Sequence, residues 1–146
     1  SFIELNKIST DELFEARVSL EMTIAELAAE KAGGSNLIDI AEELAEMCAN
    51  LELPIDYLDH DMRFHQNIAT ASQNRILLVL LKMVVSILHE RRKPTIHRAL
   101  DFRQSTIAHR EIYHAIRDKR PDDARKLMRQ HLFDTKESQK LETDND

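Results

Sequence analysis

Residues 75–92 read RILLVLLKMVVSILHERR, and this stretch decides the class of fold. Within it, residues 76–88 form an apolar run of 13 residues that only Lys82 and Ser86 interrupt. A membrane span needs roughly 20 such residues, so the run predicts a buried helix of a globular protein. Because apolar residues occupy nearly every side of this helix, we expect it to be the central one.

The composition of the 146 residues also favours helices. Two Gly and three Pro are too few turn-forming residues for an all-β sandwich or barrel, and strong helix formers such as Ala, Leu and Glu dominate long stretches. The length suits one domain with its own hydrophobic core. We therefore predict a single all-α domain.

Start and stop signals divide the chain into helical segments on both sides of this stretch. Ser9 and Glu12 form a capping-box pattern at the start of a first helix. Ser35 can cap the second helix, and Pro54 and Pro121 suit the first positions of the third and sixth. The expected segments are 13–32, 35–50, 54–71, 75–92, 96–119 with a break near 100–101, and 121–136.

These segments suggest a simple domain organisation. We assign residues 1–9 to an N-terminal linker, 10–136 to the helical domain and 137–146 to a polar tail. We expect the last helix to fray after Lys136, and residues 141–146, which are acidic and almost free of apolar residues, to be disordered.

The charge distribution and the cysteine content restrict the cellular compartment and the binding partners that we expect. Residues 1–50 carry 3 Lys/Arg against 11 Asp/Glu, and residues 51–146 carry 17 against 15. The acidic first third would repel phosphates, so we expect any DNA contact to come from another domain. Cys48 is the single cysteine, which excludes an intrachain disulfide and favours a reducing compartment. We see no signal peptide and expect a cytoplasmic protein without a membrane segment.

Four side chains that can bind a metal are expected to face the interior. Asp61 and His65 lie four residues apart, on one face of the third helix. His109 and His131 lie in apolar stripes of the fifth and sixth helices. Burying these four groups separately would be costly, whereas one divalent cation would satisfy all of them. We predict a metal site with Zn²⁺ or Ni²⁺ as the preferred ion and Mn²⁺ as a further candidate.

Each of these residues has a simpler interpretation when it is taken alone. A single inward histidine is more often a core residue bonded to a carbonyl, and Asp–His pairs at this spacing occur by chance.

The other four histidines are weaker candidates for metal ligands. His60 and His89 stand beside charged residues and His97 stands near a helix boundary, so we expect these, and His114, to be solvated.

Arg17 interrupts an otherwise apolar stripe of the first helix, and a guanidinium there requires an anion. Two partners fit equally well: Glu21, one turn later, or the carboxylate of a bound ligand. Ser105, one turn before His109, could add a hydroxyl to the same cavity or face solvent. We predict Arg17 and Ser105 as ligand-binding residues.

The motifs around these residues resemble those of a known family. They are DMRFH (61–65) followed by ASQN (71–74), HREIYHAI (109–116), ARKLMRQHL (124–132) and, in the first helix, LFEAR (13–17). Together they resemble the FCD domain of GntR-superfamily bacterial transcription regulators over about residues 10–135. Gln73 differs from the Gly that the family usually has at this turn.

The resemblance implies an antiparallel bundle of six or seven helices that binds a small effector and reports to an N-terminal winged helix-turn-helix domain. The ligands of metal-binding members fall on Asp61, His65, His109 and His131, and the arginine that contacts effector carboxylates falls on Arg17. The DNA-binding domain is not in this sequence. We therefore expect the sensing half of a homodimeric regulator, with a lactate-, gluconate- or citrate-like acid as effector.

Two other functions stay open on the residues alone. His60-Asp61 is the dipeptide of the HD phosphohydrolases, but these metal-dependent enzymes need an upstream histidine ligand and none precedes position 60. Any metal-dependent hydrolase would also need an acid–base residue beside the bound water, for which only Glu21 and Glu111 stand out. The other alternative is a helical interaction module with histidines buried for packing. We expect the chain not to be an enzyme.

Overall fold

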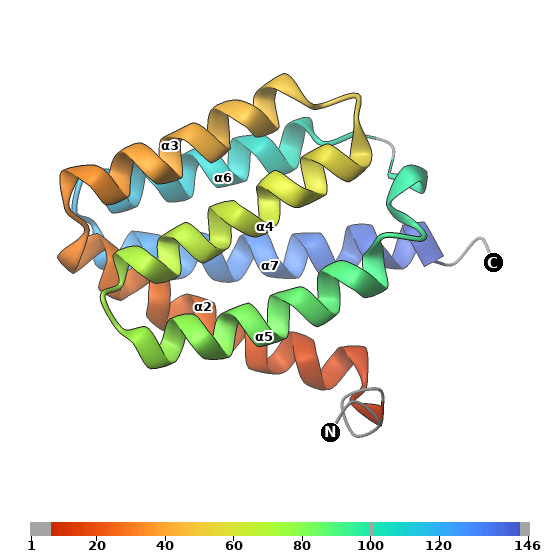
Figure 1. The fold of residues 1–146 in the computed structure, drawn as a ribbon, viewed down its shortest axis with the longest axis horizontal. Coiled ribbons are helices and arrows are strands. Elements are labelled where there is room, and N and C mark those ends of the chain that lie inside the picture. Colours follow the sequence, from red (N-terminus) through yellow and green to blue (C-terminus); the bar gives the residue numbers. More distant parts are fainter. Residues whose placement is uncertain (1–6, 100, 144–146) are drawn as a thin grey trace.

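The computed structural model describes residues 7–99 and 101–143, and this part of the chain contains no strand. The elements that lie wholly within it are α2 (Thr10–Lys31), α3 (Gly34–Ala49), α4 (Pro54–Ala71), α5 (Arg75–Arg92), the 3-10 helix η1 (Ile96–Arg98), α6 (Arg103–Arg117) and α7 (Pro121–Thr143). Successive α-helices run in alternate directions, which makes an antiparallel bundle (Figure 1). The all-α prediction is confirmed. Of the two residues of the expected break, Asp101 lies outside the helices, just before α6, and residue 100 is not among the described residues.

Local capping interactions start the first helices. The hydroxyl of Ser9 accepts a hydrogen bond from the backbone N–H of Glu12 at 3.0 Å, and the carboxylate of Glu12 accepts one from the N–H of Ser9 at 2.8 Å, so the predicted capping box begins α2. The predicted cap of the second helix is wrong. Gly33 rather than Ser35 precedes α3, because the side chain of Asn36 reaches back to the N–H of Gly33 at 2.9 Å.

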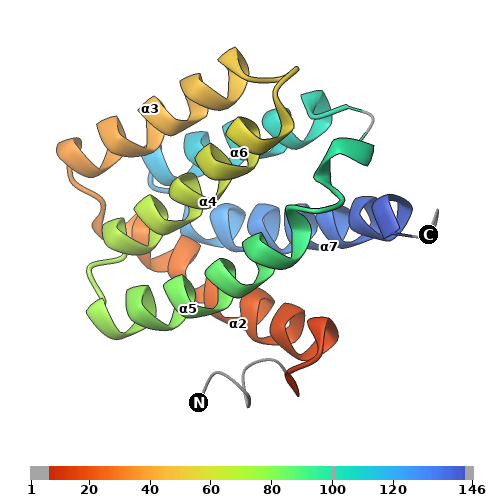
Figure 2. The same cartoon turned by 45° about the vertical axis from the view of Figure 1, so that its right-hand side comes forward.

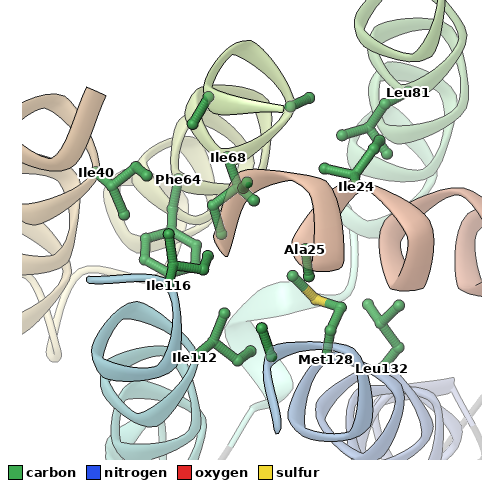
Figure 3. Packing of buried hydrophobic residues seen from close by; sticks show 14 of the residues in the cluster. Ile24, Ala25, Ile40, Phe64, Ile68, Leu81, Ile112, Ile116, Met128 and Leu132 are labelled. Atoms are coloured by element: carbon green, nitrogen blue, oxygen red, sulfur yellow. The ribbon is translucent and has the colours of Figure 1, made fainter. Parts of the chain in front are cut away.

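One hydrophobic core joins the α-helices (Figure 3). Each helix contributes at least one apolar side chain with no exposed surface, including Ile24, Ile40, Phe64, Leu81, Ile112 and Met128. Full burial of one such side chain stabilises a fold by about 1.5–3 kcal/mol. The core therefore fixes the spacing of the helices that carry the polar residues described below.

The apolar helix α5 is not the central element that its sequence predicts. It lies on the outside of the bundle and packs on α2 and α4 (Figure 2). Its outer face exposes Ile76 by 72%, Val79 by 65% and Met83 by 47%. Apolar residues on every side of a helix leave its buried face undetermined, and the contacts with α2 and α4 select only one face. Among the described residues, no helix is both long and apolar enough to cross a membrane.

Helix α7 is longer than expected. It continues to Thr143, so the predicted fraying is wrong for residues 137–143, and the predicted disorder is wrong for residues 141–143. Near its end, Glu142 is only 2% exposed and forms an ion pair with Arg92. Of the other expected tail and linker residues, 144–146 and 1–6 lie outside the described part of the chain. The domain boundaries at 9/10 and 136/137 stay predictions.

Candidate metal centre

Three helices bring the four predicted metal ligands together. Asp61 and His65 come from α4, His109 from α6 and His131 from α7, and one nitrogen or oxygen atom of each lies within 4.8 Å of the others. His65 and His109 are fully buried, and His131 is 4% exposed. The side chain of Asp61 is 14% exposed, which puts it at the edge of the cluster. The role of these residues as metal ligands stays a prediction.

A buried carboxylate that the sequence did not place in the site orients His65. Glu21 of α2 has no exposed surface and accepts a hydrogen bond from Nδ1 of His65. Its second oxygen accepts a hydrogen bond from Nε of Arg17 at 2.5 Å. Glu21 therefore joins the candidate ligand-binding arginine to a candidate metal ligand. The spacing of Arg17 and Glu21 predicts the first contact, but no local pattern predicts the second.

The other ring nitrogen of His65 faces the cluster. Nε2 is buried and has no hydrogen-bond partner among the described residues. Oδ1 of Asp61 lies 3.4 Å from it, within ion-pair range but outside hydrogen-bond geometry. A histidine that donates through one nitrogen to a carboxylate and directs the other toward a site has the orientation of a metal ligand.

His109 has a similar arrangement with a backbone partner. Its Nδ1 donates to the carbonyl oxygen of Ser105 at 2.5 Å, and its Nε2 lies 2.5 Å from Oδ1 of Asp61. The ring of His131 lies parallel to that of His65, at 5.5 Å between centroids, and its centroid is 4.2 Å from that of His109. The three imidazoles thus lie together on one side of Asp61, with one ligand atom of each within 4.8 Å of the others.

Burial and neighbouring charges set the protonation states of the cluster. Burial by itself would lower the pKa of His65, but Glu21 and Asp61 outweigh it and raise the pKa to about 9. Burial and the repulsion from His109 and His65 hold the pKa of His131 well below its usual value. Burial opposes ionisation of Asp61, yet the interactions with His109 and His65 hold its pKa well below the usual range. A neutral imidazole and a carboxylate are the forms that bind metal ions.

This donor set fits a divalent transition-metal ion. Zn²⁺ binds histidine nitrogen and carboxylate oxygen at about 2.0–2.2 Å, which places tetrahedral ligand atoms about 3.3 Å from one another. A small inward shift of side chains that now lie within 4.8 Å reaches this spacing. Imidazole and carboxylate ligands suit Zn²⁺, Ni²⁺ and Mn²⁺, and the one cysteine, Cys48, is exposed and outside the cluster.

A cavity of about 460 Å³ borders the cluster. Asp61 and His131 form part of its wall, together with Arg17, Ser105 and Tyr57. The cavity therefore brings both predicted ligand-binding residues beside two of the four candidate metal ligands. Its volume lies in the usual range for small-molecule sites, about 300–1,000 Å³.

Two histidines that were expected to be solvated are paired with carboxylates. His89 is 8% exposed, and its Nε2 lies 2.7 Å from Oδ1 of Asp59. His60 is half-buried, with its Nδ1 2.7 Å from Oε2 of Glu43. Both partners lie on neighbouring helices, which local sequence does not reveal. His97 is exposed, as expected.

Comparisons of sequence and of fold with known proteins agree on one family. A model of the FCD domain matches residues 12–134. The HTH-type transcriptional regulator LutR of Bacillus subtilis (strain 168) is 31% identical over 134 residues, which cover 88% of this chain and 61% of that protein. The chain therefore spans less than two thirds of this relative.

Two solved structures have a similar fold. Streptococcus agalactiae GntR matches with a TM-score of 0.77 and 27% identity, over 91% of this chain and 62% of that one. E. coli McbR/YncC matches in fold with a TM-score of 0.73 and 17% identity, over 88% of this chain and 68% of that one. The family match over residues 12–134 and the identity with LutR agree with the motifs of the sequence. The chain belongs to the FCD family and is an FCD domain of the GntR superfamily.

Proposed function

We propose that this domain senses a small organic acid for a transcription regulator, and that it binds a divalent metal ion through Asp61, His65, His109 and His131. One observation carries the proposal: the buried Nε2 of His65 has no hydrogen-bond partner among the described residues, although three other candidate ligand atoms lie within 4.8 Å. A buried polar atom without a partner costs about 1–3 kcal/mol. A metal ion that replaces the proton on this nitrogen would remove that cost.

The proposed ion is Zn²⁺ or Ni²⁺, with Mn²⁺ as a further candidate, because imidazole and carboxylate ligands suit these ions. A bound ion of this kind would supply Lewis-acid chemistry, which attracts a carboxylate or hydroxyl oxygen of a ligand toward Asp61 and the three histidines. Glu21 and the carbonyl oxygen of Ser105 would hold His65 and His109 in the ligating orientation.

The proposed effector is a lactate-, gluconate- or citrate-like acid in the adjoining cavity. Arg17 lines this cavity, and Glu21 occupies its Nε. A guanidinium has five N–H donors, so those on the terminal nitrogens can bind a carboxylate of the effector. Ser105 lines the same cavity and offers a hydroxyl.

The role of the whole protein follows by analogy with relatives of which this chain covers only part. LutR is described as an HTH-type transcriptional regulator, which supports a regulatory and non-enzymatic role. We propose a cytoplasmic homodimer that contacts DNA only through an N-terminal winged helix-turn-helix domain. Effector binding would favour one arrangement of the helices and hence one spacing of the DNA-binding domains, which requires different effector affinities in the two states.

Thermal unfolding after metal removal tests the metal site. Wild type, His109→Ala and His131→Ala are compared with His97→Ala, a control at an exposed histidine outside the cluster. We expect added Zn²⁺ or Ni²⁺ to raise the Tm of wild type and of His97→Ala, and to leave the other two nearly unchanged. Equal stabilisation of all four proteins would contradict the site.

A screen of carboxylic acids against the zinc-loaded chain tests the effector role. We expect at least one small acid to raise the Tm further, and Arg17→Ala to weaken its binding about tenfold or more, since a buried charge-assisted pair contributes about 1.5–3 kcal/mol. An acid whose affinity survived this substitution would exclude Arg17 from the site. Turnover of phosphoesters or amides by the loaded protein would instead favour the hydrolase alternative.

A further inference from the structure

The wall of the same cavity contains a second carboxylate-binding position, and a side chain of the protein fills it. Arg92, the last residue of α5, donates from Nη2 to Oε1 of Glu142 at 2.8 Å and from Nε to Oε2 at 3.2 Å. Arg98 of η1 donates to the backbone carbonyl of Glu142 at 3.1 Å. Two parallel bonds from one guanidinium to one carboxylate are the geometry by which arginine recognises carboxylates.

This pair borders the candidate metal centre. Arg92 and Glu142 line the 460 Å³ cavity together with Asp61, His131 and Arg17. A smaller hollow is also lined by Arg17, Asp61 and Arg92. A ligand that places one group beside Asp61 and Arg17 therefore directs its other end into a space that Arg92 borders.

The segment that carries Glu142 has little other burial. From residue 137 to 143, Glu142 is the only buried residue, and Leu141, next to it, is 68% exposed. The side chain of Arg92 is itself only 14% exposed, so the pair is shielded from solvent. Moving Glu142 away would cost the ion pair and the hydrogen bond from Arg98 but little hydrophobic burial, because the apolar residues of α7 in the core lie earlier in the helix.

We propose that Arg92 is a second carboxylate site of this domain, that Glu142 is its built-in competitor, and that the effector is an acid with at least two carboxylates, which favours a citrate-like or dicarboxylic acid over a lactate- or gluconate-like one. One carboxylate of the acid binds beside Asp61 and Arg17, and the other displaces Glu142 from Arg92 and releases the end of α7. A monocarboxylic acid fills the first position only and leaves Glu142 in place. The inference rests on the proposed function, since it assumes an acid in the cavity.

A tethered competitor lowers the apparent affinity for any ligand that must displace it. The effective concentration of a carboxylate on the same chain is of millimolar order or higher. The affinity of a dicarboxylic acid is then reduced by the fraction of molecules in which Arg92 is free of Glu142. Neutralising Glu142 should therefore strengthen the binding of dicarboxylic acids and leave that of monocarboxylic acids unchanged.

Matched acids and matched variants test this directly. Malate is lactate with one additional carboxylate, and succinate is related to propionate in the same way. Their dissociation constants are measured calorimetrically on the zinc-loaded full chain, with zinc retention checked by elemental analysis. The variants are Glu142→Gln, Arg92→Lys and, as a control, Glu137→Gln, an exposed glutamate of the same helix whose carboxylate binds Lys140 at 3.1 Å.

We expect Glu142→Gln to tighten the binding of malate or succinate about tenfold or more, and Arg92→Lys, which keeps the charge but loses the two-bond geometry, to weaken it about tenfold. Lactate and propionate should change less than about twofold, and Glu137→Gln should change nothing. In wild type, the dicarboxylic acids should increase hydrogen exchange in residues 137–143, and the monocarboxylic acids should not.

Equal dicarboxylate affinities in wild type and Glu142→Gln, or unchanged exchange in residues 137–143, would overturn the inference. Lactate or propionate binding that still depends on Arg17 would then leave the proposed function standing. If no acid of either pair bound to wild type or to any variant, the effector part of the proposed function would fail, and this inference with it.

Discussion

Replacing Glu21 by Gln tests the link between the first helix and the candidate metal centre. The carboxylate has no exposed surface and bonds both Nε of Arg17 and Nδ1 of His65. Burial alone would raise the pKa of Glu21, but His65 and Arg17 outweigh it and lower the pKa, so the group is an anion between two cationic partners. An amide of the same shape removes this charge and leaves the buried guanidinium of Arg17 without its hydrogen-bonded counterion, with the more distant Asp61 as the other anion that acts on it.

Removing one partner of a buried ion pair destabilises a protein by about 3–5 kcal/mol. Gln keeps part of the hydrogen bonding, so we expect a loss of about 3 kcal/mol for the metal-free protein. For a domain of this size, 1 kcal/mol corresponds to about 2–4 °C, which gives a decrease in Tm of about 6–12 °C. The loss of an outer partner of a ligating histidine also lowers metal affinity by about 10- to 100-fold.

Calorimetric melting and zinc titration of Glu21→Gln measure both effects. Glu26→Gln is the control, because Glu26 lies on the same helix and binds Arg125 at 3.1 Å, but both side chains are about one third exposed or more. Such a surface pair contributes about 0–1 kcal/mol. If Glu21→Gln were as stable as Glu26→Gln and bound zinc as tightly as wild type, the reasoning would be refuted.

Two further predictions concern protonation and helix α5. Because the pKa of His65 is raised to about 9 from an ordinary 6.5, the metal-free protein should keep the contribution of His65 to stability below pH 6.5 and lose it as the pH rises through 9. Zinc affinity should rise from pH 6.5 to pH 9, since zinc must displace the proton of His65. Thermal melts at several pH values, with and without zinc, check the direction of both effects. On α5, Ile76→Ser at a site that is 72% exposed should change the free energy of unfolding by less than about 0.5 kcal/mol, and Leu81→Ala at a site with no exposed surface should lower it by about 2–5 kcal/mol. Urea unfolding of both variants measures this difference, and a large loss from Ile76→Ser would argue against an outer position of that face.

The candidate metal centre could be predicted from local periodicity because its residues lie on helices. Spacing by four placed Asp61 and His65 on one face, and the apolar stripes around His109 and His131 pointed those rings inward. Periodicity could not choose between the two partners of Arg17. The structure pairs Nε of Arg17 with Glu21, and it adds a bond from His65 to Glu21, 44 positions away, which no local pattern contains.

Two features of the fold could not be predicted for a related reason. The apolar residues of α5 surround the helix, so no face stood out, and the packing against α2 and α4 decided which side is covered. The acidic composition of residues 141–143 indicated disorder, but Glu142 at this end of α7 binds Arg92, 50 residues away, and Arg98, 44 residues away. Single long-range ion pairs of this kind leave no trace in composition.

X-ray absorption spectroscopy of the zinc-loaded chain tests the central claim most directly. We predict one zinc ion per chain, with a first shell of nitrogen and oxygen atoms at about 2.0–2.2 Å and the outer-shell scattering of three imidazoles. In His131→Ala, the imidazole contribution should fall by one third, or zinc should be lost. A shell with sulfur at about 2.3 Å, or a wild-type chain that retains no zinc, would contradict a metal centre built from Asp61, His65, His109 and His131.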